Sequence, residues 1–168
     1  METQRELSRG VPVSGTNITR QEAYERSAVV TANAYEIELD LSTREATFAS
    51  KTTVRFAARE GNSTWIDFIA PVVHSIELNG EQISPSEHDG FRIPLHNLKS
   101  TNVLTVIADA AYMNTGEGLH RFIDPVDDEV YLYSQFEIAD ARRVFACFDQ
   151  PNLKATYQFT VHAPDLRD

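Results

Sequence analysis

A glutamine and a glutamate two residues apart are the residues of this chain best placed to do chemistry. They are Gln135 and Glu137, at the end of the run YLYSQFE, whose composition is typical of a β-strand. Because side chains at positions i and i+2 of a strand share one face, the two are expected to project together while Phe136 packs on the opposite face. A carboxylate beside an amide in this arrangement is suited to binding a small cation.

Charged residues follow this pair closely and could be mistaken for a catalytic cluster: Arg142, Arg143, Asp149 and Lys154. A supporting role is favoured, because a planar guanidinium can bridge two carboxylates or carbonyl oxygens. The two arginines, with Asp149, would then hold the turn after Glu137 rigid. Rigidity is what a preorganised binding group requires.

The chain lacks the residue spacing that zinc hydrolysis needs. That chemistry requires two imidazoles one helical turn apart with a glutamate between them, as in H-E-x-x-H, and a third ligand further on. No two of the five histidines are four residues apart; they are His74, His88, His96, His120 and His162. The chain is therefore expected to hold no metal ion and to contain no catalytic residue of its own.

The segment 131–151, YLYSQFEIADARRVFACFDQP, resembles the amino-terminal domain of the aminopeptidase N family of zinc metallopeptidases, the gluzincin aminopeptidases. That domain carries a Gln-x-Glu or Gln-x-Gln loop followed by DARR-x-F-x-CFD-[EQ]-P. The resemblance extends to TGEGLHRF at 115–122 and KATYQFTVHAP at 154–164. The family often has proline where Ala146 stands, a departure that affects the stiffness of the turn and leaves the implied contacts intact.

This resemblance implies a β-sandwich domain that forms one wall of the active site of a membrane alanyl aminopeptidase-like enzyme. Glu137 would bind the free α-ammonium of a peptide substrate, and Gln135 would contact the substrate beside it. The zinc ion and the family's Gly-Ala-Met-Glu-Asn motif belong to a catalytic domain of the same polypeptide, which this sequence lacks. The implied partners are thus that domain and peptides with a free N-terminus, and the 168-residue chain should be inactive alone.

Other interpretations of the same residues stay open. The chain could be a stand-alone β-sandwich module that binds a protein partner without catalysis. Glu137 could be an exposed glutamate that serves only solvation, and the amide of Gln135 could fix Glu137 in place or satisfy a backbone group. Glu117 and His120 could act as an acid and base, although without a metal or nucleophile they have nothing to act on.

Composition limits the class of protein. A net charge of −10, with 15 basic residues against 25 acidic ones, argues against a nucleic-acid partner. No apolar run approaches the roughly 18 residues of a membrane span, and the polar N-terminus has no signal-peptide core. The single cysteine, Cys147, fits a reducing compartment and is expected to be a small buried residue rather than a nucleophile. We therefore expect a cytoplasmic protein without a membrane partner.

Periodicity divides the chain into a mobile polar tail, 1–18, and one domain, 19–168. Thr19 followed by Glu22 has the spacing of a capping box and predicts a short helix from Arg20 to Ala28. Asn79-Gly80 predicts a tight hairpin turn. Alternating or short apolar runs predict strands at 34–41, 48–56, 65–69, 72–78, 81–84, 91–95, 103–108, 130–137 and 156–161.

So many short strands joined by loops indicate an all-β protein. The sequence predicts an antiparallel β-sandwich or a large saddle-shaped sheet with a short N-terminal helix.

Overall fold

The structure, a computed structural model, describes residues 17–42, 44–137 and 139–164. Most of the predicted mobile tail, 1–18, lies outside these residues. The elements in chain order are α1 (Arg20–Val29), β1 (Val30–Asp40), β2 (Thr47–Ala58), β3 (Thr64–Asp67), β4 (Val72–Leu78), β5 (Glu81–Ile83), η1 (Pro85–Glu87), β6 (Arg92–Leu95), β7 (Thr101–Ala111), β8 (Gly118–Ile123), β9 (Val130–Gln135), η2 (Ala141–Arg143) and β10 (Thr156–His162). Strands dominate, so the predicted all-β fold is confirmed.

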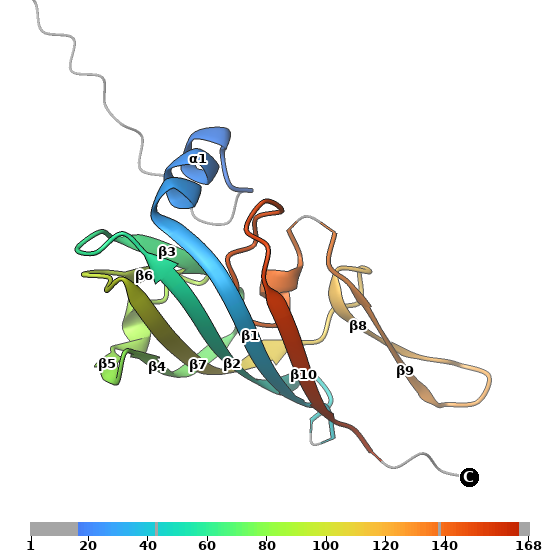
Figure 1. Ribbon diagram of the computed structural model, residues 1–168. Coiled ribbons are helices and arrows are strands. Elements are labelled where there is room, and N and C mark those ends of the chain that lie inside the picture. Colours follow the sequence, from blue (N-terminus) through green and yellow to red (C-terminus); the bar gives the residue numbers. More distant parts are fainter. Residues whose placement is uncertain (1–16, 43, 138, 165–168) are drawn as a thin grey trace, which may run out of the picture.

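Six strands form one large sheet in the order β10-β1-β2-β7-β4-β5 (Figure 1). Neighbouring strands run antiparallel except β1 and β10, which are parallel and place Tyr35 opposite Tyr157. The period-two pattern predicted for β2 is confirmed, because Ser50, Thr52 and Val54 are buried while Arg55 faces solvent. The large sheet therefore has one inner face and one solvated face.

A second layer covers the inner face of this sheet. It consists of the two-stranded sheet β3-β6 and the segment 144–148, whose buried residues join those of the large sheet in one core. Hydrogen bonds tie the segment to β2: Ser50 Oγ donates to the Val144 carbonyl at 2.8 Å, and the Ala146 amide donates to Thr52 Oγ1 at 3.3 Å. This packing of two layers around a common core is the predicted sandwich.

Local signals in the sequence specify α1 and the β4–β5 hairpin. The Thr19 side chain accepts a hydrogen bond from the Glu22 amide at 3.2 Å, and Glu22 Oε2 accepts one from the Thr19 amide at 2.8 Å. At the hairpin, Asn79 has φ of 56° and Gly80 of 85°, as the predicted turn requires. Both predictions are confirmed.

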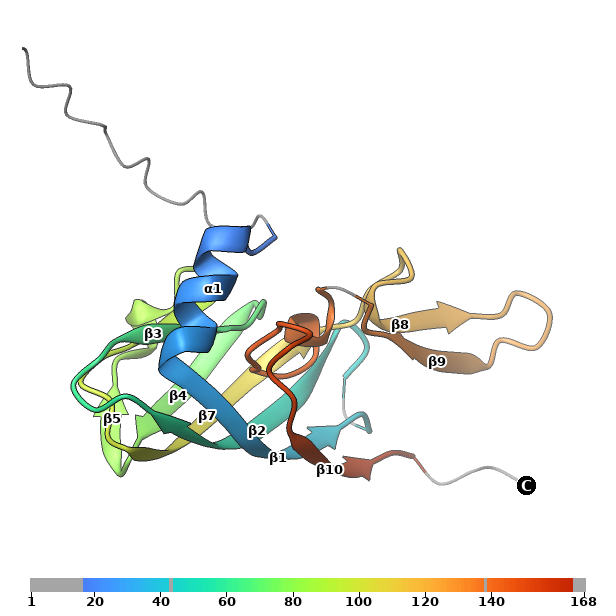
Figure 2. The ribbon, with the colours of Figure 1, turned by 45° about the horizontal axis from the view of Figure 1, so that its top comes forward.

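Two predictions near the candidate site were wrong. The sequence predicted no strand between 108 and 130, but the segment TGEGLHRF contains β8, which pairs with β9 in a separate hairpin that projects from the body of the domain (Figure 2). Strand β9 ends at Gln135 rather than at Glu137. The chain turns there because the ring of Phe136 packs edge-on against Phe145, with centroids 5.7 Å apart.

Candidate functional site

Gln135 and Glu137 lie at the point where β9 gives way to a turn. The sequence predicted that the two side chains share a strand face, and this is wrong because Glu137 lies beyond the end of β9. Instead, the Glu137 amide donates a hydrogen bond of 3.1 Å to the Gln135 side-chain oxygen. Both side chains are exposed. Within residues 17–42, 44–137 and 139–164, the carboxylate of Glu137 has neither a hydrogen bond nor an ion pair. A negative charge thus stands at the strand end with its oxygens available.

Arg143 lies next to the strand pair that ends at Gln135, and two carboxylates hold it there. Its Nη2 lies 3.0 Å from Glu117 Oε2 and its Nε lies 2.8 Å from Asp140 Oδ1. Gly118 pairs with Gln135 across the β8–β9 hairpin, and a Cβ added to Gly118 would lie only 2.9 Å from the Cβ of Arg143. The arginine is therefore packed against β8 and connects the turn before β8 to the turn after Glu137.

Arg142 is buried and fixes the same turn from the inside. Its amide donates to Asp149 Oδ2 at 3.1 Å, its Nε donates to the Ala139 carbonyl at 2.9 Å, and its own carbonyl accepts from the Ile69 amide at 2.7 Å. Burial raises the pKa of Asp149, although the Arg142 amide opposes that effect. The three contacts are those expected of a residue that holds the turn rigid.

An ion pair that sequence reasoning missed lies deeper. Arg26 of α1 is fully buried, and its Nη1 lies 2.5 Å from Asp67 Oδ2 while its Nε donates to Gln150 Oε1 at 2.9 Å. Asp67 Oδ2 also accepts from the Asp149 amide at 3.2 Å, and the Arg26 guanidinium lies over the Trp65 ring at 5.1 Å. The pair thereby joins α1 to the FDQP segment. In the sequence, Arg26 lies in a short and mostly polar helix, where an arginine is ordinarily expected to face solvent.

The other candidates from the sequence do not form a catalytic group. His120 stacks on Tyr133, with ring centroids 4.6 Å apart, and its Nδ1 accepts a hydrogen bond of 3.0 Å from the Gly116 amide. Glu117 is engaged with Arg143. An acid and base pair made of Glu117 and His120 is therefore not formed.

Cys147 is buried, as predicted. Burial, with the nearby carboxylates Asp149 and Asp67, raises the pKa of its thiol well above the ordinary value. A thiol that stays protonated is a poor nucleophile. Lys154 takes no part in the contacts of the arginines; it lines a hollow of about 310 Å³ with Phe136, Phe148 and Tyr157.

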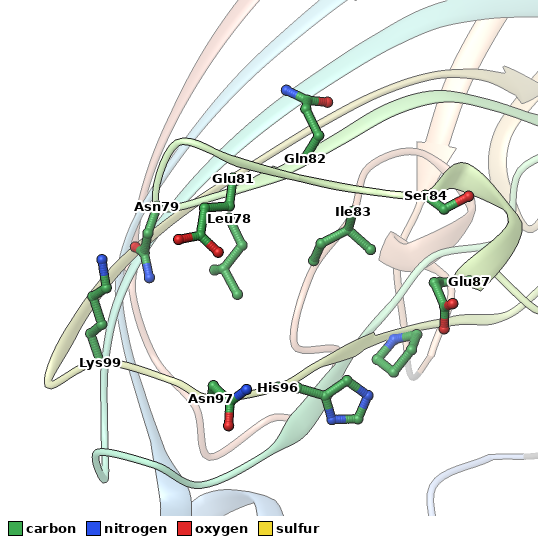
Figure 3. A pocket seen from close by; sticks show the side chains of 11 residues that line it. Leu78, Asn79, Glu81, Gln82, Ile83, Ser84, Glu87, His96, Asn97 and Lys99 are labelled. Carbon is green, nitrogen blue, oxygen red and sulfur yellow. The ribbon is translucent and has the colours of Figure 1, made fainter.

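A larger hollow lies elsewhere, between the β4–β5 hairpin and the β6–β7 connection (Figure 3). It measures about 730 Å³, and Glu81, Glu87, His96 and Lys99 are among the residues that line it. Figures 1 and 2 place β5 and the β8–β9 hairpin at opposite ends of the domain, so this hollow does not belong to the Glu137 site.

No group of three or more histidine, cysteine, aspartate or glutamate residues in the described part of the chain is placed to hold a metal ion. Across the same residues, none of the helices is long and apolar enough to cross a membrane.

Residues 31–167 match the family described as the Peptidase M1 N-terminal domain. Among curated proteins, the chain is 54% identical over 156 residues to aminopeptidase N of Streptomyces lividans, which covers 90% of this chain and 18% of that protein. It is 29% identical over 147 residues to the alanine/arginine aminopeptidase of Saccharomyces cerevisiae, a match that covers 79% of this chain and 17% of that protein. The chain thus spans less than a fifth of the length of these relatives.

Solved structures share the fold at low sequence identity. Yeast LTA4 hydrolase in complex with bestatin superposes with a TM-score of 0.66 at 17% identity, over 95% of this chain and 26% of that one. Legionella pneumophila aminopeptidase A in complex with aspartic acid superposes with a TM-score of 0.65 at 17% identity, over 79% of this chain and 16% of that one.

Proposed function

Because the chain belongs to the Peptidase M1 N-terminal domain family, we propose that it is the amino-terminal domain of a longer zinc-dependent aminopeptidase that releases N-terminal residues from peptides. The 54% identity to an aminopeptidase N, of which the chain spans 18%, supports both the activity and the larger size. The zinc ion would be held by the catalytic domain of the same polypeptide, where it would polarise the scissile carbonyl and activate water.

The role of this domain is to hold the substrate by its α-ammonium through Glu137. The observation that carries this proposal is the exposed Glu137 carboxylate, which has no partner among the residues that the structure describes, whereas two other acids in this region, Glu117 and Asp140, are both occupied by Arg143. A substrate ammonium carries three N–H donors and no acceptor, as a lysine head group does, so it complements a carboxylate whose oxygens are available.

The backbone that carries this carboxylate is held in place by nearby contacts. The Gln135 side chain accepts from the Glu137 amide, while Arg142 fixes the carbonyl of Ala139 two residues further along. Arg142 is held in turn by Asp149. A binding group whose backbone is fixed loses less entropy when the substrate arrives than one on a loose loop, and it keeps the anchor at a constant position relative to the scissile bond.

Expression of the polypeptide that the gene encodes, together with the 168-residue chain alone, tests the function. The longer protein should contain H-E-x-x-H after residue 168, should release amino acids from peptides with a free N-terminus, and should lose this activity to a strong chelator. The short chain should be inactive. A gene that ends at residue 168 and yields a stable monomer would overturn the proposal in favour of an interaction module.

A further inference from the structure

Arg143 is a cation beside the strand end that precedes Glu137. Its side chain leaves the backbone against Gly118, whose missing Cβ would come within 2.9 Å of the Arg143 Cβ. Gly118 is paired with Gln135 across the hairpin, about one strand spacing (~5 Å) away, so the base of the arginine side chain lies against the strand pair that ends at Gln135. The Glu137 amide is hydrogen-bonded to the Gln135 side chain, which keeps Glu137 next to this strand pair. The side chain of Arg143 is long and flexible, so its guanidinium can turn toward Glu137.

Two carboxylates hold this guanidinium instead. Nη2 lies 3.0 Å from Glu117 Oε2, and Nε lies 2.8 Å from Asp140 Oδ1. Asp140 is three residues before Arg143 in the same turn, whereas Glu117 reaches it from the turn that precedes β8. Glu117 is therefore the partner that draws the end of the guanidinium away from its own turn and toward β8.

Competition for Glu137 has a clear physical cost. A guanidinium pairs with a carboxylate through two parallel hydrogen bonds, so an arginine that turned to Glu137 would occupy the oxygens that an ammonium needs. It would also repel an incoming cation. An Arg143 released from Glu117 and turned to Glu137 would therefore make the Glu137 carboxylate less available.

We propose that Glu117 is a positioning residue that keeps Arg143 engaged and so keeps Glu137 available for the substrate α-ammonium. The inference rests on the proposed function of Glu137. Glu117 itself does not touch the substrate. It acts through Arg143 on the acidic anchor, and it makes the TGEG turn part of the apparatus that selects substrates with a free N-terminus.

The test uses the full-length polypeptide and three single variants. Glu117→Gln releases one side of Arg143 and should raise KM for a free-amine substrate about tenfold with a smaller change in kcat, since a charged hydrogen bond to the substrate is lost in part of the molecules. Glu117→Asp keeps the charge and should stay within about threefold of the parent. Glu38→Gln is the matched control, because it breaks an exposed ion pair with Lys51, at 2.8 Å on another strand pair, and should have no effect.

Two double variants separate positioning from a loss of structure. Glu117→Gln with Arg143→Met should recover most of the affinity, because the competing cation is gone. Glu117→Gln added to Glu137→Gln should raise KM no further, because the group it protects is absent. If Arg143→Met does not fold, as judged by thermal unfolding, the second double variant still decides.

The proposal is overturned if Glu117→Gln behaves like Glu38→Gln, or if it slows the Glu137→Gln enzyme as much as it slows the parent. A different result would reject the proposed function itself: in that case, Glu137→Gln alone would leave turnover of the free-amine substrate unchanged. A loss with Glu137→Gln and none with Glu117→Gln would retain the anchor and reject the role of Glu117.

Discussion

The Glu137 amide donates a hydrogen bond of 3.1 Å to the side-chain oxygen of Gln135. Through this bond the last residue of β9 fixes the position of the first acidic residue beyond it. Gln135 is itself paired with Gly118 in the β8–β9 ladder. The backbone of the residue proposed to bind the substrate is therefore attached to the end of a strand rather than carried on a loose loop. Precise binding requires such a rigid attachment.

The contact between Gly118 and Arg143 predicts a specific cost for a methyl group. Gly118→Ala should destabilise the domain by about 2–4 kcal/mol, because alanine is strained at the Gly118 φ of +62° and its Cβ meets the Arg143 Cβ at 2.9 Å. Urea unfolding measures the change. Gly61→Ala is the control, since Gly61 has φ of +76° and no atom within 4 Å of an added Cβ. Equal losses in the two variants would show that the contact with Arg143 contributes nothing.

The buried pair of Arg26 and Asp67 predicts a large loss when one partner is removed. Arg26→Met should cost about 3 kcal/mol, because it removes the cation that contacts Asp67 Oδ2 and leaves this buried carboxylate with the longer ion pair between its Oδ1 and Arg92 Nε, at 3.7 Å. Arg55→Met removes an exposed partner, 3.2 Å from Glu36, and should cost less than about 1 kcal/mol. Chemical unfolding of both variants checks this order, and a loss for Arg26→Met no larger than that for Arg55→Met would contradict it.

Glu22 should make the stability of the domain depend on acid. Burial alone would raise its pKa, but hydrogen bonds from Arg92 and Thr19 outweigh that effect and lower the pKa from 4.5 to about 2. A carboxyl whose pKa is lower in the folded state stabilises the fold fully above about pH 4.5, and this contribution is lost as pH falls toward 2.

The measurement is the difference in unfolding free energy between the parent and Glu22→Gln as a function of pH. The difference should be constant above about pH 5 and should shrink steadily between pH 4.5 and 2. Lys51→Gln, which breaks an exposed pair with Glu38, serves as the control and should show little change. A difference for Glu22→Gln that does not vary over this range would contradict the account.

Apolar residues on the β8–β9 hairpin and on β10 predict that the isolated chain associates with itself. Large apolar side chains there are about half exposed: Phe122, Ile123, Val130, Tyr131, Tyr133, Tyr157, Phe159 and Val161. In the longer protein we expect other parts of the polypeptide to cover them. Phe145 and Phe148 in the neighbouring segment are buried in the core and add nothing to this surface.

Light scattering and binding of a hydrophobic dye check this prediction. The chain should form oligomers at high concentration, and Ile123→Ser with Tyr131→Ser should reduce both signals without lowering stability, because neither side chain is buried. Val126→Ser changes an isolated residue at the hairpin tip and serves as the control. A parent chain that stays monomeric and binds no dye would be inconsistent with this prediction.

The parts of this fold that the sequence predicts are those specified by neighbouring residues. The capping box of α1, the alternation of β2 and the turn at Asn79-Gly80 each depend on residues a few positions apart, and each was confirmed. Strand β8 was missed because it does not alternate: its buried residues come first and Phe122 and Ile123 are exposed, since the hairpin leaves the body of the domain. The Gly-flanked start of β8 also reads as a turn.

The candidate site was predicted by resemblance in its residues but not in its geometry. Nothing local shows that Arg26 meets Asp67 or that Glu117 meets Arg143, because these pairs depend on how distant segments pack. The prediction that Gln135 and Glu137 share a strand face was wrong for a similar reason. The packing of Phe136 on Phe145, which ends β9 early, is a tertiary contact.

The most direct measurement is kcat/KM of the full-length parent and of Glu137→Gln on one peptide with a free α-amine and on its N-acetylated form. A carboxylate paired with an ammonium in a water-poor site contributes roughly 2–4 kcal/mol, so the variant should lose about 30- to 1000-fold on the free amine, with KM rising at least in part. The acetylated peptide should be a poor substrate of the parent and should lose little more. If the mutation slows both peptides equally, or leaves the free amine within about twofold of the parent, Glu137 does not bind the substrate amine.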